Sequence, residues 1–175
     1  MNNYLVISAN GPDKPGLINQ FSKILLECGC NLLNSRMTTL GAEFSLNILL
    51  SGNWSTIAKL EALVPSIEKQ LDLDIHIRRS SLPNNSCKTM TYVVHVVTID
   101  RPGIMNELAQ FFTHQAINIE DVSAYTYSGY SNTRMVAMTM NINISVNVHI
   151  PSLREQFMNY CDALNLDAGM EPLRD

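Results

Sequence analysis

A short motif with the residue types needed for ligand binding occurs twice in the chain. Asp13-Lys14-Pro15-Gly16 is matched 87 residues later by Asp100-Arg101-Pro102-Gly103. Because proline lacks an N–H, we expect Pro15 and Pro102 in a first helical turn, with the aspartates capping free amides. The glycines leave those amides approachable, and the positive end of a helix dipole favours an anion such as a carboxylate. The motif alone fits a simple helix start as well as an anion site.

An asparagine repeats with the motif and favours the functional interpretation. Asn31 and Asn118 each follow the glycine of their motif by fifteen residues. We predict that each begins a strand close to the next strand–helix turn of its sheet, where its amide is available to a ligand.

The helices predicted after the two motifs share one pattern of buried residues. Their apolar positions follow the i, i+4, i+7, i+8 spacing of one helical face. These residues are Leu17, Phe21, Ile24 and Leu25 in the first copy and Ile104, Leu108, Phe111 and Phe112 in the second. A second pair of helices repeats at an offset of 93, with Ile57, Leu60, Val64, Ile67 and Leu71 matching Ile150, Leu153, Phe157, Tyr160 and Leu164. The change of offset predicts six inserted residues, which we place in a hairpin around residues 126–134.

Strands rich in β-branched and aromatic residues precede each first helix, at residues 3–9 and 91–98. Two more strands fit between the helices of each copy, and residues 71–79 form a closing strand. The matching end of copy two contains Gly169 and Pro172, which weaken the case for its last strand.

Each copy therefore has the order strand, helix, strand, strand, helix, strand. This order predicts an α+β fold of two ferredoxin-like βαββαβ domains, each an antiparallel four-stranded sheet with both helices on one face. We predict domains at residues 1–80 and 90–175, joined by a Ser-, Asn- and Pro-rich linker at 81–89.

Composition limits the partners and the location of the protein. The chain has 12 Lys and Arg against 16 Asp and Glu, a net charge of -4, which argues against direct binding to nucleic acid. No signal peptide or membrane-spanning run is recognisable, so we expect a cytoplasmic protein that does not bind a membrane. The four cysteines fit no paired spacing and are interpreted as free thiols.

The motifs of common catalytic and metal sites are missing from the sequence. Neither a glycine-rich phosphate loop nor a G-x-S-x-G elbow occurs, and no nucleophile and base can be paired. The histidines are scattered, and Cys28-Gly29-Cys30 stands without a second ligand pair. We therefore predict no enzyme, no metal and no cofactor.

The order strand, Asp-x-Pro-Gly, helix, Gly-x-Asn and paired strands resembles the ACT domain, a ferredoxin-like module that senses amino acids and other small metabolites, usually at an interface between two copies. Residues 4–21 and 28–54 are further similar to the glycine cleavage system transcriptional repressor family, in which tandem ACT domains fill the chain. The similarity is strong over residues 3–60, moderate over 90–145 and weak after residue 150.

This resemblance implies a regulator of the glycine cleavage genes that binds a transcriptional activator and is relieved by glycine or another small amino acid. It places the ligand loop of the family on Asp13, Pro15, Gly16 and Leu17 with Asn31, and on Asp100, Pro102, Gly103 and Ile104 with Asn118. Serine-sensing ACT domains often have asparagine where this chain has the two aspartates. A carboxylate repels the carboxylate of the ligand but pairs with its ammonium.

Two further hypotheses remain beside a repressor that acts through protein contact. The chain is alternatively a regulatory ACT subunit that binds an amino acid and controls a metabolic enzyme. A direct DNA-binding role comes third, given the charge. Exposed sheet edges also leave room for a homodimer.

Overall fold

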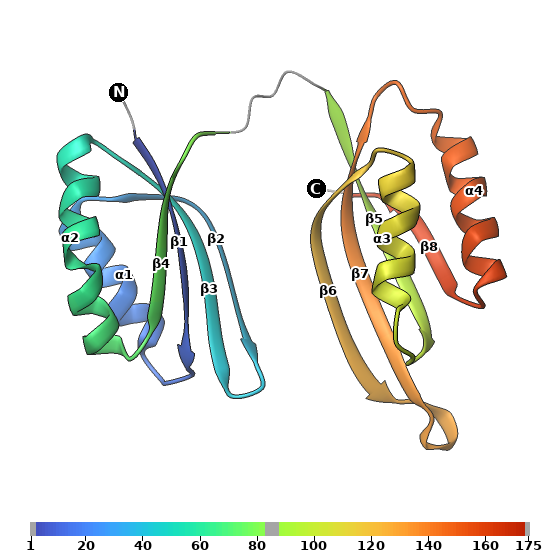
Figure 1. Ribbon diagram of the computed structural model, residues 1–175, viewed down its shortest axis with the longest axis horizontal. Helices are drawn as coiled ribbons and strands as arrows, with labels where there is room; N and C mark the ends of the chain where they lie inside the picture. The colour runs from blue at the N-terminus through green and yellow to red at the C-terminus, as the bar shows by residue number, and fades with distance from the viewer. Residues whose placement is uncertain (1–2, 83–87, 174–175) are drawn as a thin grey trace. The chain divides into compact units, whose positions relative to one another are not determined.

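The computed structural model describes residues 3–82 and 88–173 (Figure 1). The chain divides into two compact units, residues 1–83 and 84–175. Of the predicted linker, residues 83–87 lie outside the described residues. No helix of the described ranges is long and apolar enough to cross a membrane.

The two units repeat one order of elements. The first contains β1 (Asn3–Pro12), α1 (Leu17–Cys28), β2 (Asn31–Leu40), β3 (Glu43–Gly52), α2 (Trp54–Leu71) and β4 (Asp74–Ser80). The second contains β5 (Thr89–Ile99), α3 (Ile104–His114), β6 (Asn118–Ser128), the 3-10 turn η1 (Tyr130–Asn132), β7 (Arg134–Ser145), α4 (Ile150–Ala163) and β8 (Asp167–Pro172).

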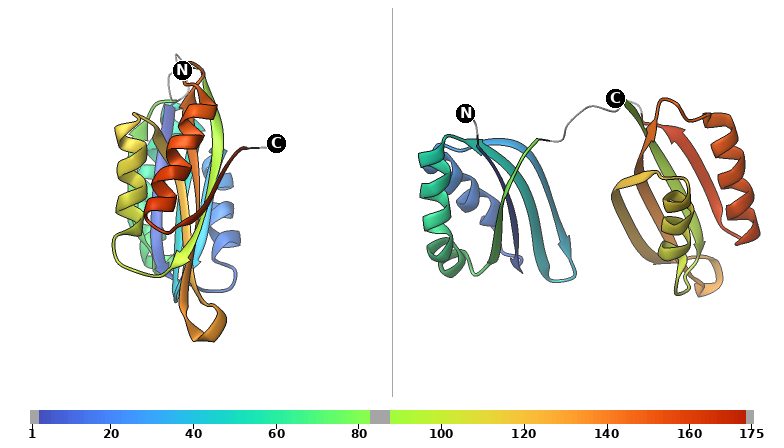
Figure 2. Two further views of the ribbon diagram at one scale, coloured as in Figure 1. Left: turned by 90° about the vertical axis from the view of Figure 1, so that its right-hand side faces the viewer. Right: turned by 45° about the horizontal axis from the view of Figure 1, so that its top comes forward.

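Each unit forms one antiparallel four-stranded sheet. The strand orders are β2-β3-β1-β4 and β6-β7-β5-β8, and all pairs are antiparallel. Both helices of a unit lie on the same side of its sheet (Figures 1 and 2). The predicted fold of tandem ferredoxin-like βαββαβ domains is confirmed.

Alternation along the central strands places the core between sheet and helices. Leu5, Ile7 and Ala9 of β1 are buried, whereas the residues between them lie on the face that no helix covers. The predicted helical faces supply the other side of the core, with Ile24, Ile150, Tyr160 and Leu164 only partly buried.

The last strand of the second unit forms despite its weak sequence signal. β8 pairs with β5 from Asp167 to Pro172, opposite Val97 to Tyr92. It is an edge strand, and Pro172 is its last residue, so the missing N–H of proline interrupts no central ladder.

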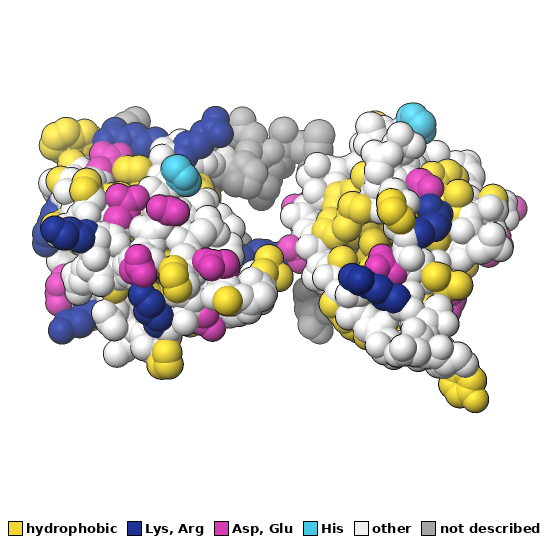
Figure 3. Space-filling view, turned by 60° about the horizontal axis from the view of Figure 1, so that its bottom comes forward, with side chains coloured by type: hydrophobic (Ala, Val, Ile, Leu, Met, Phe, Trp, Pro, Cys, Tyr) yellow, Lys and Arg dark blue, Asp and Glu magenta, His cyan; other side chains and the backbone are white. Residues whose placement is uncertain are grey.

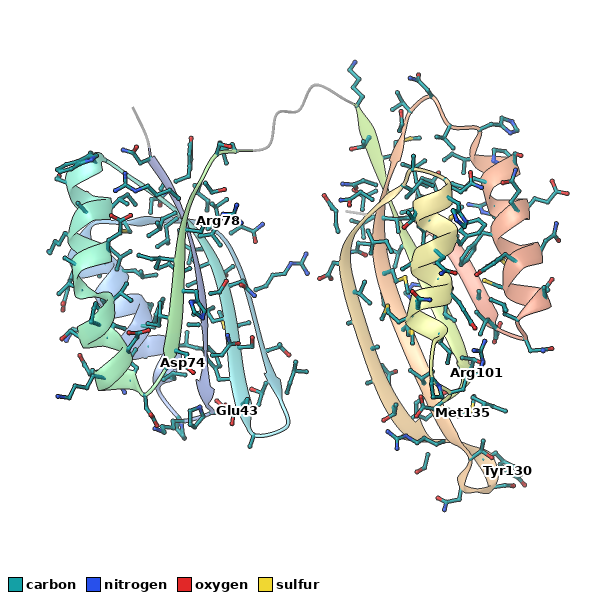
Figure 4. The ribbon with its side chains drawn as sticks, viewed as in Figure 1. Glu43, Asp74, Arg78, Arg101, Tyr130 and Met135 are labelled. Atoms are coloured by element: carbon teal, nitrogen blue, oxygen red, sulfur yellow. The ribbon has the colours of Figure 1, made fainter. Side chains whose placement is uncertain are left out.

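The strand pairings locate the predicted insertion. In the first unit Leu40 and Glu43 form the last pair before a two-residue turn. Their equivalents in the second unit, Tyr127 and Met135, flank seven residues. Five of the six inserted residues therefore lie in the β6–β7 hairpin, with Tyr130 near its tip (Figure 4), and the sixth precedes α4.

Candidate functional site

The Pro-Gly pair forms a turn before the helix rather than its first residues. Gly16 has φ 85° and ψ 0°, and the Leu17 N–H donates to the Lys14 carbonyl over 3.3 Å. Proline followed by a left-handed glycine is the signature of a type II turn. Helix α1 begins only at Leu17 and has no side-chain cap, so the prediction of Pro15 in the first helical turn and Asp13 as a cap was wrong.

The second motif has the same backbone. Gly103 has φ 97° and ψ -12°, α3 begins at Ile104, and no side chain caps the helix. Pro102 and Asp100 therefore also lie outside the helix. Because neither helix start carries a side-chain cap, the amides of the first turn that the backbone does not use, such as those of Ile18 and Asn19 in α1, are left to other hydrogen-bond acceptors.

An open depression of about 750 Å³ lies at the first turn. It combines the Asp-x-Pro-Gly turn and the start of α1 with residues of the β2–β3 hairpin. Its lining consists of Asp13, Lys14, Pro15, Gly16, Leu17, Ile18, Asn19, Met37, Thr38, Thr39 and Phe44. The structure thus brings four of the predicted ligand residues together, Asp13, Pro15, Gly16 and Leu17.

Asn31 and Asn118 lie at the other end of their sheets. Asn31 is the first residue of β2 and pairs with Ser51, next to the turn into α2, as predicted. The ten residues of β2 span roughly 30 Å at about 3.3 Å per residue, so Asn31 does not reach the Asp13 turn of its own unit. Asn118 pairs with Asn143 in the same way.

Sequence reasoning missed the contribution of the hairpin to the depression. Thr39 pairs with Phe44 in β3, which in turn pairs with Gly11 at the end of β1. The tight turn after Leu40 was a signal that fixes this register, and following it would have placed Thr39 beside Asp13.

Within the described part of the chain, one side chain is hydrogen-bonded to the Asp13 carboxylate. Thr39 Oγ1 donates to Asp13 Oδ2 over 3.3 Å, and the Asp13 N–H donates to the Ala42 carbonyl over 3.1 Å. The adjacent Lys14 turns to Asp72, with 2.7 Å between Nζ and Oδ2. Among residues 3–82 and 88–173, no cation forms an ion pair with Asp13.

The second turn is internally paired. Arg134 Nε lies 2.8 Å from Asp100 Oδ2. Arg101 donates two hydrogen bonds, of 2.8 and 2.6 Å, to the carboxylate of Glu107 in the first turn of α3. Hydrogen bonding from Arg101 lowers the pKa of Glu107, so this carboxylate stays ionised at neutral pH. Figure 4 shows Arg101 and Met135 at this end of the unit.

The first turn is therefore suited to a small zwitterion. Uncapped amides at the start of α1 are donors for a carboxylate, and the Asp13 carboxylate is an acceptor for an ammonium.

The charged side chains of the surface are mixed in sign. In Figure 3, Lys and Arg side chains lie among Asp and Glu, and no broad face of one sign is seen from this side.

The described residues support neither metal binding nor a reactive thiol. No three His, Cys, Asp or Glu side chains gather there as a metal site requires. Cys28 and Cys30 are free, and burial raises the pKa of both thiols, which therefore stay protonated at neutral pH.

Comparison with known proteins identifies the family to which this chain belongs. A family model described as the ACT domain matches residues 3–78. The glycine cleavage system transcriptional repressor of Escherichia coli (strain K12) is 30% identical over 173 residues, which cover 95% of this chain and 88% of the relative. The chain belongs to the glycine cleavage system transcriptional repressor family. The protein of the same name from Shigella flexneri matches with the same identity and coverage.

Solved structures agree with this membership of the repressor family. A crystal structure provisionally named as a glycine cleavage system transcriptional repressor is 28% identical, with a TM-score of 0.77 over 100% of this chain and 99% of that chain. An unknown protein from Galdieria sulphuraria has a TM-score of 0.78 at 20% identity, covering 99% of this chain and 100% of its own, which shows the shared fold alone.

Proposed function

We propose that the chain is a non-catalytic, amino-acid-responsive regulator. In this proposal it represses the glycine cleavage genes by contacting a transcriptional activator, and glycine relieves the repression. The depression at the Asp13 turn, in a chain of the repressor family, is the observation that carries the proposal.

The ligand chemistry of the depression supports an amino acid as effector. A bound carboxylate receives hydrogen bonds from the first amides of α1 and gains from the positive end of the helix dipole. The ammonium pairs with Asp13, a carboxylate that has no ion pair with a cation of the described residues. Glycine satisfies both contacts and has no side chain to accommodate, which fits an open depression.

Repression through protein contact agrees with the charge of the chain. A net charge of -4 gives little attraction to a nucleic-acid backbone, so a repressor of this composition works through another protein. The proposal includes a cytoplasmic location, where genes and activator meet. It also includes a homodimer as one assembly state, because β2 is an exposed edge strand.

An effector changes partner binding only through different affinities for the free and the partner-bound protein. A coupling free energy of about 1–3 kcal/mol corresponds to roughly a 5- to 150-fold change in affinity for the partner. Helix α1 and the β2–β3 hairpin both line the depression, so a ligand bound there contacts two elements of the first unit at once.

Isothermal calorimetry with glycine tests the effector. We expect saturable heat at millimolar glycine or below for the wild-type chain, and an affinity at least tenfold weaker for Asp13→Asn. Asp74→Asn is a matched control, because Asp74 is an exposed carboxylate of the same unit outside the depression. No heat, together with unchanged thermal melting in glycine, would exclude glycine as the effector.

Affinity purification of the tagged chain tests the partner. We expect a transcriptional activator in the eluate, and less of it when glycine is added. A biosynthetic enzyme in its place would favour a regulatory subunit of that enzyme, and a mobility shift of bare DNA would favour direct DNA binding.

A further inference from the structure

The two Asp-x-Pro-Gly turns share a backbone but differ in charge. In the first unit Asp13 has a threonine hydroxyl as its side-chain partner, and the first turn of α1 holds no acidic residue. In the second unit Asp100 is paired with Arg134, and the first turn of α3 holds the ionised Glu107. The second turn thus already contains two guanidinium groups and two carboxylates of the chain itself, paired with one another.

Two substitutions between the copies create this difference. Gln20 occupies in α1 the position that Glu107 occupies in α3, 87 residues later. Ala42 and Arg134 occupy equivalent backbone positions, since their carbonyls accept the N–H of Asp13 over 3.1 Å and of Asp100 over 2.9 Å. Arg134 is therefore a substitution at an equivalent position, and its longer side chain brings a cation to Asp100.

We infer that only the first unit binds the amino-acid effector, and that Arg134 and Glu107 close the equivalent site of the second unit by supplying its charges internally. This inference rests on the proposed function and adds to it the number and the location of effector sites, one per chain at the Asp13 turn.

The physical reason is a cation that already occupies the ammonium position and a carboxylate that lies beside the carboxylate position. An incoming ammonium has to displace a guanidinium held 2.8 Å from Asp100, whereas Asp13 forms no ion pair with any cation that the structure describes. An incoming carboxylate at α3 approaches a helix start that already has the Glu107 carboxylate in its first turn, and like charges repel, although the pair with Arg101 reduces this repulsion. At α1 the equivalent side chain is the neutral Gln20.

Arg101 holds the Glu107 carboxylate in place at the second turn. Its bidentate pair with Glu107 fixes that carboxylate at the start of α3, and the side chains of both residues are less than two-fifths exposed. The equivalent Lys14 instead pairs with Asp72, away from the first turn of α1. The basic residue of the motif therefore holds a carboxylate beside the helix start in one unit only.

Equilibrium dialysis with radiolabelled glycine and amide NMR shifts test the inference on the full chain. We expect one glycine bound per chain, with saturable shifts for the amides of residues 16–19 and none for those of residues 103–106. Ala42→Arg places a guanidinium where Arg134 has it in the second unit, and we expect it to weaken glycine binding at least tenfold. Ala42→Gln, a long neutral side chain, controls for size and should retain the affinity.

The outcomes separate this inference from the proposed function. Two glycines per chain, or shifts at residues 103–106 that match those at residues 16–19, would overturn the inference of a single site. The proposed function as an amino-acid-responsive regulator would still stand. Unchanged affinity of the folded Ala42→Arg chain would also overturn it. Wild-type protein that binds no glycine in either measurement would refute the proposed effector itself.

Discussion

Gly11 shows how one missing side chain shapes the end of β1 beside the candidate site. A Cβ built on Gly11 would lie 2.5 Å from the Asp72 carbonyl oxygen and 2.8 Å from Leu73 Cδ2. The backbone after α2 therefore passes too close to β1 for any side chain at this position. The equivalent residue of the second unit is Thr98, whose hydroxyl donates to the Asn165 carbonyl over 3.3 Å.

We predict that Gly11→Ala lowers the free energy of unfolding of the first unit by about 2 kcal/mol or more, because backbone atoms must move to admit the methyl group. Urea denaturation measures the change. Gly169→Ala is the control, because a Cβ there meets nothing within 4 Å, and we expect a change within roughly 0.5 kcal/mol. Equal stability of the two variants would contradict this close approach.

The buried thiol of Cys161 should lower the free energy of unfolding at alkaline pH. Its side chain is fully buried, and burial raises the pKa of the thiol from the usual 9.0 to about 11. Below pH 9 folded and unfolded chains both hold the proton, whereas between pH 9 and 11 mainly the unfolded chain releases it. The free energy of unfolding should therefore fall by roughly 2–3 kcal/mol over this window, at about 1.4 kcal/mol per pH unit.

The measurement is urea denaturation between pH 8 and 11 for the wild type and Cys161→Ala. The variant is less stable near pH 8 because of the cavity, but its pH slope should be shallower, since the other titrating groups are common to both chains. Parallel curves for the two proteins would rule out Cys161 as the source of the slope.

At the scale of elements, helix α2 has the side-chain cap that α1 lacks. Asn53 Oδ1 accepts the Thr56 N–H over 2.8 Å and the Ser55 hydroxyl over 2.7 Å. We predict that Asn53→Ala destabilises the first unit by about 1 kcal/mol, as loss of a helix cap usually does, and that Asn53→Ser restores most of the loss. Thermal denaturation followed by circular dichroism checks both. A serine variant as weak as the alanine variant would mean that capping is not the cause.

The elements also show what the sequence could predict. Helical faces such as Leu17, Phe21 and Leu25 were identified because burial imposes a period on local residues. The exact helix start was missed, because proline followed by glycine fits both a first helical turn and a type II turn before it. β8 was uncertain because pairing with β5, a contact distant in the chain, decides whether so short a strand forms.

The candidate site was predictable only in its local part. Asp13, Pro15, Gly16 and Leu17 lie in one motif, so sequence alone grouped them. Thr39 and Phe44 join through strand register, and Arg134 meets Asp100 because the start of β7 pairs with the end of β5. Such contacts depend on the folded sheet and leave no repeated spacing in the sequence.

Across the whole chain, two separate cores follow from the duplication. One cluster of buried residues contains Leu5, Leu60 and their neighbours, and the other is built around the stacked rings of Phe112 and Phe157, 5.4 Å apart. Every buried residue of the first cluster comes from residues 5–75, and every one of the second from 92–170. We therefore propose that each unit is its own cooperative unit of unfolding.

Hydrogen exchange with mass spectrometry tests this independence on the full chain. Phe157 is fully buried, so Phe157→Ala should cost roughly 3–5 kcal/mol, and the amides of β5 and β7 should lose protection by that amount. Amides of β1 and β3 should keep their protection, because Phe157 belongs to the other core. Leu60→Ala is the reciprocal variant and should expose β1 and β3 alone. Loss of protection in both sheets from either substitution would show one cooperative molecule, since a single unfolding event then opens both cores.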